Sequence, residues 1–289
     1  MTRPLLAIAV ALTALPVARA ADPFEFKDGD RVVFIGSTLI EREQRYGYWE
    51  LALTLKNRDK NVTFRNLGWS GDTVWGEARN GFDNNPKGFE RLVALTKELK
   101  PTVVVVCYGH NESFDGEAGV EKFTKQLEKL LDSLAPTKAR TVLMSPTPFE
   151  KVAPLTDAEL RNKNLALYRD AIKSVAGKRE LEFVDGFANV QAQTASEPHT
   201  ENGLHMAAAG YHNTASAVAG YTASSAEDLR KKIVDKNQLF FHRWRPQNET
   251  YLLGFRKHEQ GKNAVEIAEF DPLVAAMEKE IAELKKALK

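Results

Sequence analysis

Residues 102–112 read TVVVVCYGHNE, an unbroken apolar run followed at once by glycine and polar side chains. A run without polar alternation is typical of a strand covered on both faces, as in a parallel sheet. Similar short, β-branched runs predict five strands in all, at 31–35, 61–66, 102–107, 141–145 and 181–184. Helical patterns alternate with them, at 41–57, 89–99, 119–134, 157–176 and 207–219. This alternation predicts an α/β fold, a three-layer α/β/α flavodoxin-like sandwich around a five-stranded parallel sheet.

Two groups of side chains are expected in the core of this sandwich. Tyr46, Trp49 and Leu53 recur at helical spacing, so we interpret them as core residues rather than as a ligand platform. Cys107 ends the apolar run of its strand, where a buried and inert thiol is expected. It is the only cysteine of the chain, so no internal disulfide can form and the fold depends on core packing.

The composition is that of an ordinary globular protein, with 43% hydrophobic and 27% charged residues in a chain of 289. Forty Lys and Arg residues against 39 Asp and Glu residues give a net charge of +1. A charge balance this close leaves no electrostatic footprint for a polyanion or an anionic bilayer. We therefore expect no nucleic-acid partner.

The first twenty residues, MTRPLLAIAVALTALPVARA, have the features of a secretory signal peptide. Arg3 precedes an apolar stretch over 5–15, and Ala18-Arg19-Ala20 forms a small-x-small cleavage site. The stretch is shorter than the roughly 20 residues that span a bilayer, and no later stretch is long and apolar enough. We expect a mature, secreted or periplasmic protein that starts near Ala21. The alternative interpretation is an N-terminal core helix.

The pattern changes after the sandwich domain, which we place at 21–227, and a C-terminal extension follows at 228–289. Residues 236–263 mix aromatic and basic side chains without a clean period. Asp271-Pro272 then offers a helix N-cap followed by proline. Apolar residues step by three and four along this last helix, at Val274, Met277, Ile281, Leu284 and Leu288. The seam covers about two heptads, which suits either a terminal helix docked on its own domain or a homodimer zipper.

Polar residues that could take part in catalysis follow the predicted strands. Ligands of open parallel sheets bind beyond the carboxyl ends of the strands. These positions hold GST at 36–38, NLGWSGD at 66–72 and GHNE at 109–112, and NGLH at 202–205 precedes the last helix of the domain. A hydroxyl at a strand-to-helix turn, amides beside glycine, a side-chain amide and a histidine are the parts of an acyl-transfer site.

In order and spacing, these segments resemble the SGNH (GDSL-type) hydrolase family over residues 31–211. The family's Gly-Asp-Ser turn matches 36–38, which places Thr38 at the position of the nucleophile. Gly68 matches the glycine whose amide joins the oxyanion hole, and Asn111 matches the asparagine that completes it. Asn202 and His205 match the acid and base of the triad. The resemblance implies an esterase without a cofactor, acting on a small ester or an acylated glycan.

The departures from the family pattern fall on the catalytic positions. Thr38 replaces serine, and its extra methyl group restricts χ1 and crowds an incoming carbonyl; Ser37 offers a primary hydroxyl one residue earlier. Asn202 replaces aspartate, a change that costs about 10⁴ in rate in serine proteases because the histidine adopts the wrong tautomer. The adjacent Glu201 is an alternative acid. Two functions follow: an exported ester hydrolase, or a non-catalytic protein whose cleft binds a carbohydrate or a partner.

Other motifs give weaker indications. The segments FHRWRP at 241–246 and FRKH at 255–258 resemble the C-terminal region of SGNH-type proteins exported by planctomycete-like bacteria. Asp72 and Glu77 are interpreted as solvated loop carboxylates, and Trp69 and Trp75 as either sugar-stacking or packing residues. Neither a P-loop nor a dinucleotide fingerprint is present. We expect no metal site, because metal-ligand spacing is absent among His110, His199, His212, His242 and His258.

Overall fold

A computed structural model describes residues 22–81, 87–193, 197–222, 226–246, 249–252, 254–259 and 263–288. The expected signal peptide at 1–20 and the expected first mature residue, Ala21, lie outside these ranges. Within them, no helix has the length and apolar character needed to cross a membrane. Five parallel strands form one sheet in the order β2-β1-β3-β4-β5, as predicted. They are β1 (Arg31–Gly36), β2 (Thr63–Asn66), β3 (Val103–Cys107), β4 (Arg140–Met144) and β5 (Glu182–Val184).

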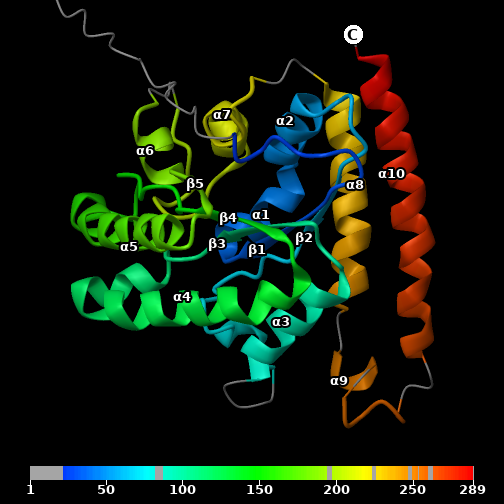
Figure 1. The fold of residues 1–289 in the computed structure, drawn as a ribbon, viewed down its shortest axis with the longest axis horizontal. Coiled ribbons are helices and arrows are strands. Elements are labelled where there is room, and N and C mark those ends of the chain that lie inside the picture. The colour runs from blue at the N-terminus through cyan, green and yellow to red at the C-terminus, as the bar shows by residue number, and fades with distance from the viewer. Residues whose placement is uncertain are drawn as a thin grey trace, which may run out of the picture.

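Helices cover both faces of this sheet (Figure 1). The α-helices are α1 (Thr38–Tyr46), α2 (Tyr48–Lys56), α3 (Lys87–Glu98), α4 (Val120–Leu134), α5 (Ala158–Lys178), α6 (Gly186–Gln191), α7 (Ala208–Ala219), α8 (Glu227–Trp244), α9 (Glu249–Leu252) and α10 (Phe270–Ala287). Short 3₁₀ segments are η1 (Glu77–Arg79), η2 (Glu112–Gly119), η3 (Ala135–Thr137) and η4 (Asn263–Glu269).

Alternate residues of the central strand supply two separate hydrophobic cores. Val103 and Val105 pack in the core that includes α1, α2 and α7, whereas Val104 and Val106 pack in the core that includes α3, α4 and α5. Successive side chains of a strand point to opposite faces, so an unbroken valine run fits a sheet covered on both sides. The predicted three-layer α/β/α architecture is therefore confirmed.

The helix predicted at 41–57 is in fact two helices. Gly47 adopts a left-handed conformation (φ 67°) between α1 and α2, a conformation that glycine reaches without steric cost. Glu43 secures the break, because its Oε1 accepts from the amides of Trp49 (3.0 Å) and Glu50 (3.2 Å) at the start of α2. The apolar spacing continues across the break, since Trp49 and Leu53 are buried as predicted. The periodicity of apolar residues therefore did not reveal the break at Gly47.

The C-terminal extension packs along the β2 edge of the sheet. Helix α8 occupies much of the stretch for which no element was predicted, and α10 runs beside it (Figure 1). Lys236 of α8 is fully buried and donates to Glu50 Oε1 (2.5 Å) and to the carbonyl of Phe64 (3.2 Å). Val274 and Ile281 of the predicted seam are buried within the chain. The seam thus serves intrachain packing, and a homodimer stays a prediction.

Candidate active site

The carboxyl end of β1 presents a hydroxyl at the start of α1. Ser37 occupies the N-cap position and is only 3% exposed, whereas Thr38, the first helical residue, is half-buried. Thr38 Oγ1 accepts a hydrogen bond from the amide of Gly71 at 2.9 Å. The first amides of a helix lack intrahelical acceptors and give this end a partial positive charge. Thr38 is therefore the hydroxyl best placed for chemistry at this edge.

Gly71, rather than Gly68, supplies the backbone donor beside Thr38. The amide of Gly68 donates to Asn66 Oδ1 (2.8 Å) and is thus already used within the chain. A Cβ atom on Gly68 would lie 2.3 Å from the Glu41 amide nitrogen, so glycine is required there for close packing on α1. Both amides thus have acceptors within the chain, and the role of Gly68 as an oxyanion donor stays a prediction.

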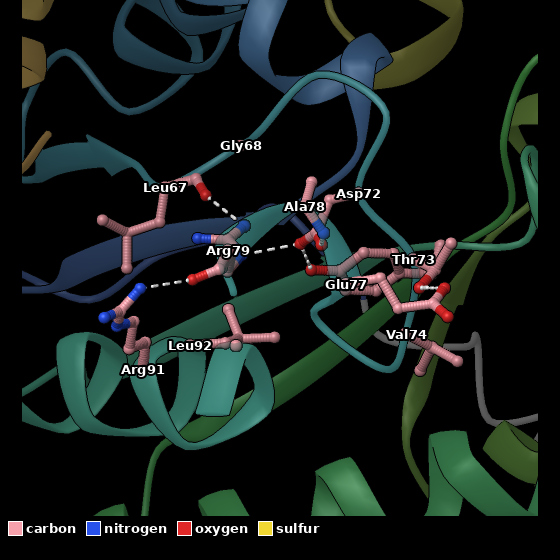
Figure 2. A network of polar contacts seen from close by, with 12 residues as sticks. Leu67, Gly68, Asp72, Thr73, Val74, Glu77, Ala78, Arg79, Arg91 and Leu92 are labelled. Carbon is pink, nitrogen blue, oxygen red and sulfur yellow. Dashed lines mark hydrogen bonds and ion pairs between the residues drawn. The ribbon is translucent and has the colours of Figure 1, made fainter. Parts of the chain in front are cut away.

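Residues 67–72, called the 67–72 loop, are held by a buried ion pair (Figure 2). Asp72 is fully buried, which corrects its interpretation as a solvated carboxylate. Its Oδ2 accepts from Arg79 Nε (2.6 Å) and from the Tyr108 hydroxyl (2.9 Å). Arg79 Nη2 also donates to the Leu67 carbonyl (2.7 Å). One guanidinium group thereby joins both ends of the loop.

The segment after β3 attaches to the same loop. Asn111 Nδ2 donates to the Asp72 carbonyl (2.7 Å), which uses one of its two amide hydrogens and leaves the other for a ligand. Glu112 accepts from the amides of Val74 (2.7 Å) and Gly109 (2.9 Å). Burial raises the pKa of Glu112 to about 7 despite these bonds. The backbone of this segment is thus fixed relative to Thr38.

Residues 200–206, called the 200–206 loop, carry the histidine. Asn202 Oδ1 accepts from the amides of Leu204 (3.2 Å) and His205 (2.8 Å), so its side-chain amide nitrogen must point the other way. That nitrogen, Nδ2, lies 3.2 Å from His205 Nδ1. Because Nδ2 can only donate, Nδ1 must accept, and a neutral ring then carries its proton on Nε2. This tautomer has no lone pair on Nε2 to accept a proton from a nucleophile.

An arginine on α1 holds the 200–206 loop in place. Arg42, four residues after Thr38, donates through Nε to the Met206 carbonyl (3.2 Å) and pairs through Nη2 with Glu201 Oε1 (2.5 Å). Glu201 therefore pairs with Arg42, while His205 Nδ1 faces the asparagine amide. Burial lowers the pKa of His205, the charge of Arg42 lowers it further, and Glu201 opposes them. Because residues four apart share one face of a helix, the spacing of Arg42 from Thr38 could have identified it from the sequence.

These contacts bring the predicted residues to one edge of the sheet. Asn111 reaches the backbone next to Gly71, which in turn donates to Thr38. His110 precedes Asn111 in the chain, and its pKa is lowered to about 4 by burial and by the charge of His205. A hydroxyl and two amide donors therefore meet at the carboxyl ends of β1, β2 and β3. The imidazole of His205 lies just before α7, in a loop that Arg42 ties to α1.

A cavity of about 510 Å³ opens beside this edge. Phe149 lines it and packs its ring 4.5 Å from that of His110. Met206, Glu150, Thr200 and other polar and apolar side chains complete the lining. Within the described ranges, no group of three or more His, Cys, Asp or Glu side chains could hold a metal ion.

The GDSL-like lipase/acylhydrolase family matches residues 33–212, more than half of the chain, and the protein belongs to this family. Its fold is similar to an acetylxylan esterase from Geobacillus stearothermophilus, solved as a catalytic mutant, with a TM-score of 0.54 and 17% identity over 70% of this chain and 97% of that one. An α/β hydrolase from the metagenome of Lake Arreo gives a TM-score of 0.53 and 19% identity, over 70% and 100% of the two chains.

A gut microbial diltiazem-metabolising enzyme gives a TM-score of 0.52 and 20% identity, over 68% of this chain and 47% of that one. No curated protein matches the sequence. At these identities the solved structures establish the fold, while the family match establishes the hydrolase class. Helices α8 and α10 lie beyond the matched residues.

Proposed function

We propose that the protein is an exported hydrolase of small acyl or acetyl esters, including those on glycans, and that its turnover is slow. The observation that carries this proposal is the placement of Thr38 Oγ1 against the Gly71 amide, at the start of a helix and beside Asn111. Family membership and an acetylxylan esterase of similar fold support the ester substrate. The sequence of residues 1–20 supports export.

The proposed chemistry is acyl transfer through Thr38. Its Oγ1 attacks the ester carbonyl carbon, and its proton passes to His205 Nε2. As Oγ1 forms its bond to carbon, the Gly71 amide, which donates to Oγ1 in the free protein, turns to the developing oxyanion. The oxyanion also accepts from the second amide hydrogen of Asn111, close to the positive end of α1. The C–O bond then breaks, His205 returns the proton to the leaving alcohol, and water hydrolyses the acyl-threonine by the same proton transfers.

Slow turnover follows from the contact between Asn202 and His205. To act as a base, His205 must carry its resting proton on Nδ1, where it would face the Nδ2 donor of Asn202 at 3.2 Å. After proton transfer the imidazolium lies near Arg42 and has no carboxylate at Nδ1. Both effects raise the barrier for proton transfer.

A cavity beside the 200–206 loop supports a substrate larger than an acetate ester, although none of the proposed catalytic residues lines it. Its volume of about 510 Å³ is in the range of pockets that hold drug-sized ligands. Its lining includes apolar Phe149 and Met206 and the side-chain amides of Gln191 and Gln193. Such a lining suits a sugar, which has both apolar ring faces and hydroxyl groups.

A second candidate function is non-catalytic binding of a carbohydrate in the same cleft. The donor of Asn202 at His205 Nδ1 favours it, because this contact holds the ring in the tautomer that cannot accept the nucleophile's proton.

Hydrolysis of p-nitrophenyl acetate by the purified protein separates the two candidates. We expect slow turnover that is lost in Thr38→Ala and in His205→Ala. Ser37→Ala is the matched control, because Ser37 makes no side-chain cap bond and should leave turnover unchanged. Inert wild type that binds a xylooligosaccharide would support the binding protein. Fast turnover that survives Thr38→Ala would refute Thr38 as nucleophile and make Ser37 the next residue to test.

A further inference from the structure

The end of α8 lies against the 67–72 loop. The guanidinium carbon of Arg245 is 3.7 Å from the centre of the Trp69 ring, and the Trp244 ring meets Trp69 edge-on at 5.7 Å. Arg245 Nη1 also lies 3.3 Å from Glu41 Oε2. Trp244 and Arg245 belong to the FHRWRP segment, which lies outside the part of the chain that the family covers. The contacts therefore join the extension to the candidate active site.

Glu41 connects Arg245 to the donor amide. This α1 residue is only 3% exposed, and its Oε2 accepts a hydrogen bond from the amide of Ser70. The next amide, that of Gly71, donates to Thr38 Oγ1. Two side chains of α1 thus hold two successive amides of the loop. A shift of Glu41 or of Trp69 would move the Gly71 amide relative to Thr38.

A buried carboxylate such as that of Glu41 requires positive charge nearby. Arg245 supplies it at 3.3 Å, while Arg45 is more distant at 3.7 Å and largely exposed. The flat guanidinium of Arg245 also covers the indole of Trp69, a cation–π contact that strengthens when water is excluded. Arg79 lies 5.4 Å from the same ring, so two guanidinium groups fix its position.

We propose that Arg245 is a positioning residue, through which the C-terminal extension sets the Gly71 amide against Thr38. Arg245 acts through Glu41 and Trp69 and does not touch the substrate. Its role in turnover rests on the proposed function, whereas its effect on the loop does not. The same contacts account for Trp69, which packs between arginines rather than serving as a sugar platform.

Arg243 provides a matched control on the same helix. Its side chain is 27% exposed, the same fraction as Arg245, and it pairs with Glu98 (3.4 Å) and Asp271 (2.9 Å). Both partners are more than half exposed, and neither belongs to the 67–72 loop. Substitution of Arg243 therefore removes a similar arginine and similar ion pairs without changing the contacts of Trp69 or Glu41.

Hydrogen–deuterium exchange of the whole protein tests the positioning directly. We expect Arg245→Ala to speed exchange at the Ser70 and Gly71 amides by about tenfold, as fits the loss of a desolvated cation–π contact. Arg245→Lys keeps the charge beside Glu41 but not the planar stacking, so it should give an intermediate rate. Arg243→Ala should leave both amides unchanged. Unchanged exchange in Arg245→Ala, or an equal increase in Arg243→Ala, would overturn the proposal.

Ester hydrolysis gives the second readout. A displaced oxyanion donor should lower kcat by about tenfold or more and leave KM nearly unchanged, because the donor acts mainly in the transition state. Arg245→Lys should recover part of kcat. Equal kcat values for Arg245→Ala and an active wild type would overturn the role in turnover. Faster exchange in a protein whose wild type hydrolyses nothing would instead refute the proposed function and leave the positioning intact.

Discussion

The 67–72 loop and the 200–206 loop differ in how well their charged and polar groups are matched. Both loops attach to α1, the first through Thr38 and the second through Arg42. In the first loop the buried carboxylate of Asp72 meets a guanidinium and a hydroxyl. In the second loop the histidine meets an amide donor in place of a carboxylate. The buried carboxylate of the first loop is therefore matched by donors, while the histidine of the second loop faces a donor at Nδ1.

This difference separates the two halves of the proposed acyl-transfer site, the loop beside the hydroxyl and the loop that carries the histidine. Asn202 keeps the local structure, because its Oδ1 still accepts from two amides of the 200–206 loop. Only the atom that faces His205 has changed from an acceptor to a donor. The loop is consequently held by Asn202 through Oδ1, while Nδ2 favours the tautomer of His205 with its proton on Nε2.

Repair of the 200–206 loop together with the nucleophile should have the largest effect. In Thr38→Ser/Asn202→Asp, the new Oδ2 can accept from His205 Nδ1–H without any change at Oδ1. We expect turnover of p-nitrophenyl acetate to rise by about 10⁴, the cost of the reverse change in a serine-protease triad. The gain should exceed the product of the two single gains, since the residues act as a unit. An inert double variant would contradict the account of the mismatch.

Removal of the buried guanidinium of Arg79 should show how much its pair with Asp72 contributes to stability. Arg79→Met leaves the carboxylate of Asp72 buried without its partner, which should lower the free energy of unfolding by about 3–5 kcal/mol. Arg42→Met in the other region breaks a pair whose carboxylate, on Glu201, is half exposed, and should cost about 1 kcal/mol or less. Urea denaturation measures the free energy of unfolding of both variants. Equal losses would contradict the difference proposed between the two loops.

Loss of the side-chain donor should become measurable once the repaired enzyme is available. Asn111→Ala in that background should lower kcat by about 10²–10³, as the loss of one oxyanion donor does elsewhere. The same substitution in wild type should matter less, because proton transfer limits its rate. A repaired enzyme insensitive to Asn111→Ala would show that the oxyanion accepts from other groups.

Stability should depend on pH through α1, which carries both loops. Burial raises the pKa of Glu43 from 4.5 to about 7, with a further contribution from Glu50. Between these values unfolding releases a proton, so the free energy of unfolding falls as pH rises, by up to roughly 3 kcal/mol for this group. Glu43→Gln keeps an acceptor for the amides of α2 and should make the decline with pH smaller. The remaining decline is expected from Glu112, whose pKa is also raised to about 7. Chemical denaturation at pH 4, 6 and 8 measures it, and an unchanged decline would contradict the assignment.

The sheet could be predicted from the sequence because its strands are short apolar runs. The valine run at 103–106 has no polar residue, so strand, burial and parallel pairing all followed from one pattern. The division of the first helix at Gly47 was not predictable from apolar spacing, which continues through the break. Helix α8 was missed because its buried face includes the charged Lys236, whose partner Glu50 lies far away in sequence.

The site was predicted as far as residue order allows. Thr38 and Asn111 follow β1 and β3, and Asn202 and His205 precede α7, as the order of the motifs predicted, while their roles stay predictions. The contact of the Gly71 amide with Thr38 Oγ1 was not predicted, because it depends on how the 67–72 loop packs on α1. The contacts of Arg245 required the packing of distant segments, which no local pattern specifies.

The protonation of His205 tests the central claim most directly. Nitrogen-15 NMR of the wild-type imidazole at pH 8, above its lowered pKa, distinguishes protonated from unprotonated ring nitrogens. We expect an unprotonated Nδ1 and a protonated Nε2 in wild type, and the reverse in Asn202→Asp. The resonances of His205 can be assigned by their loss in His205→Gln. A wild-type ring that carries its proton on Nδ1 would contradict the account.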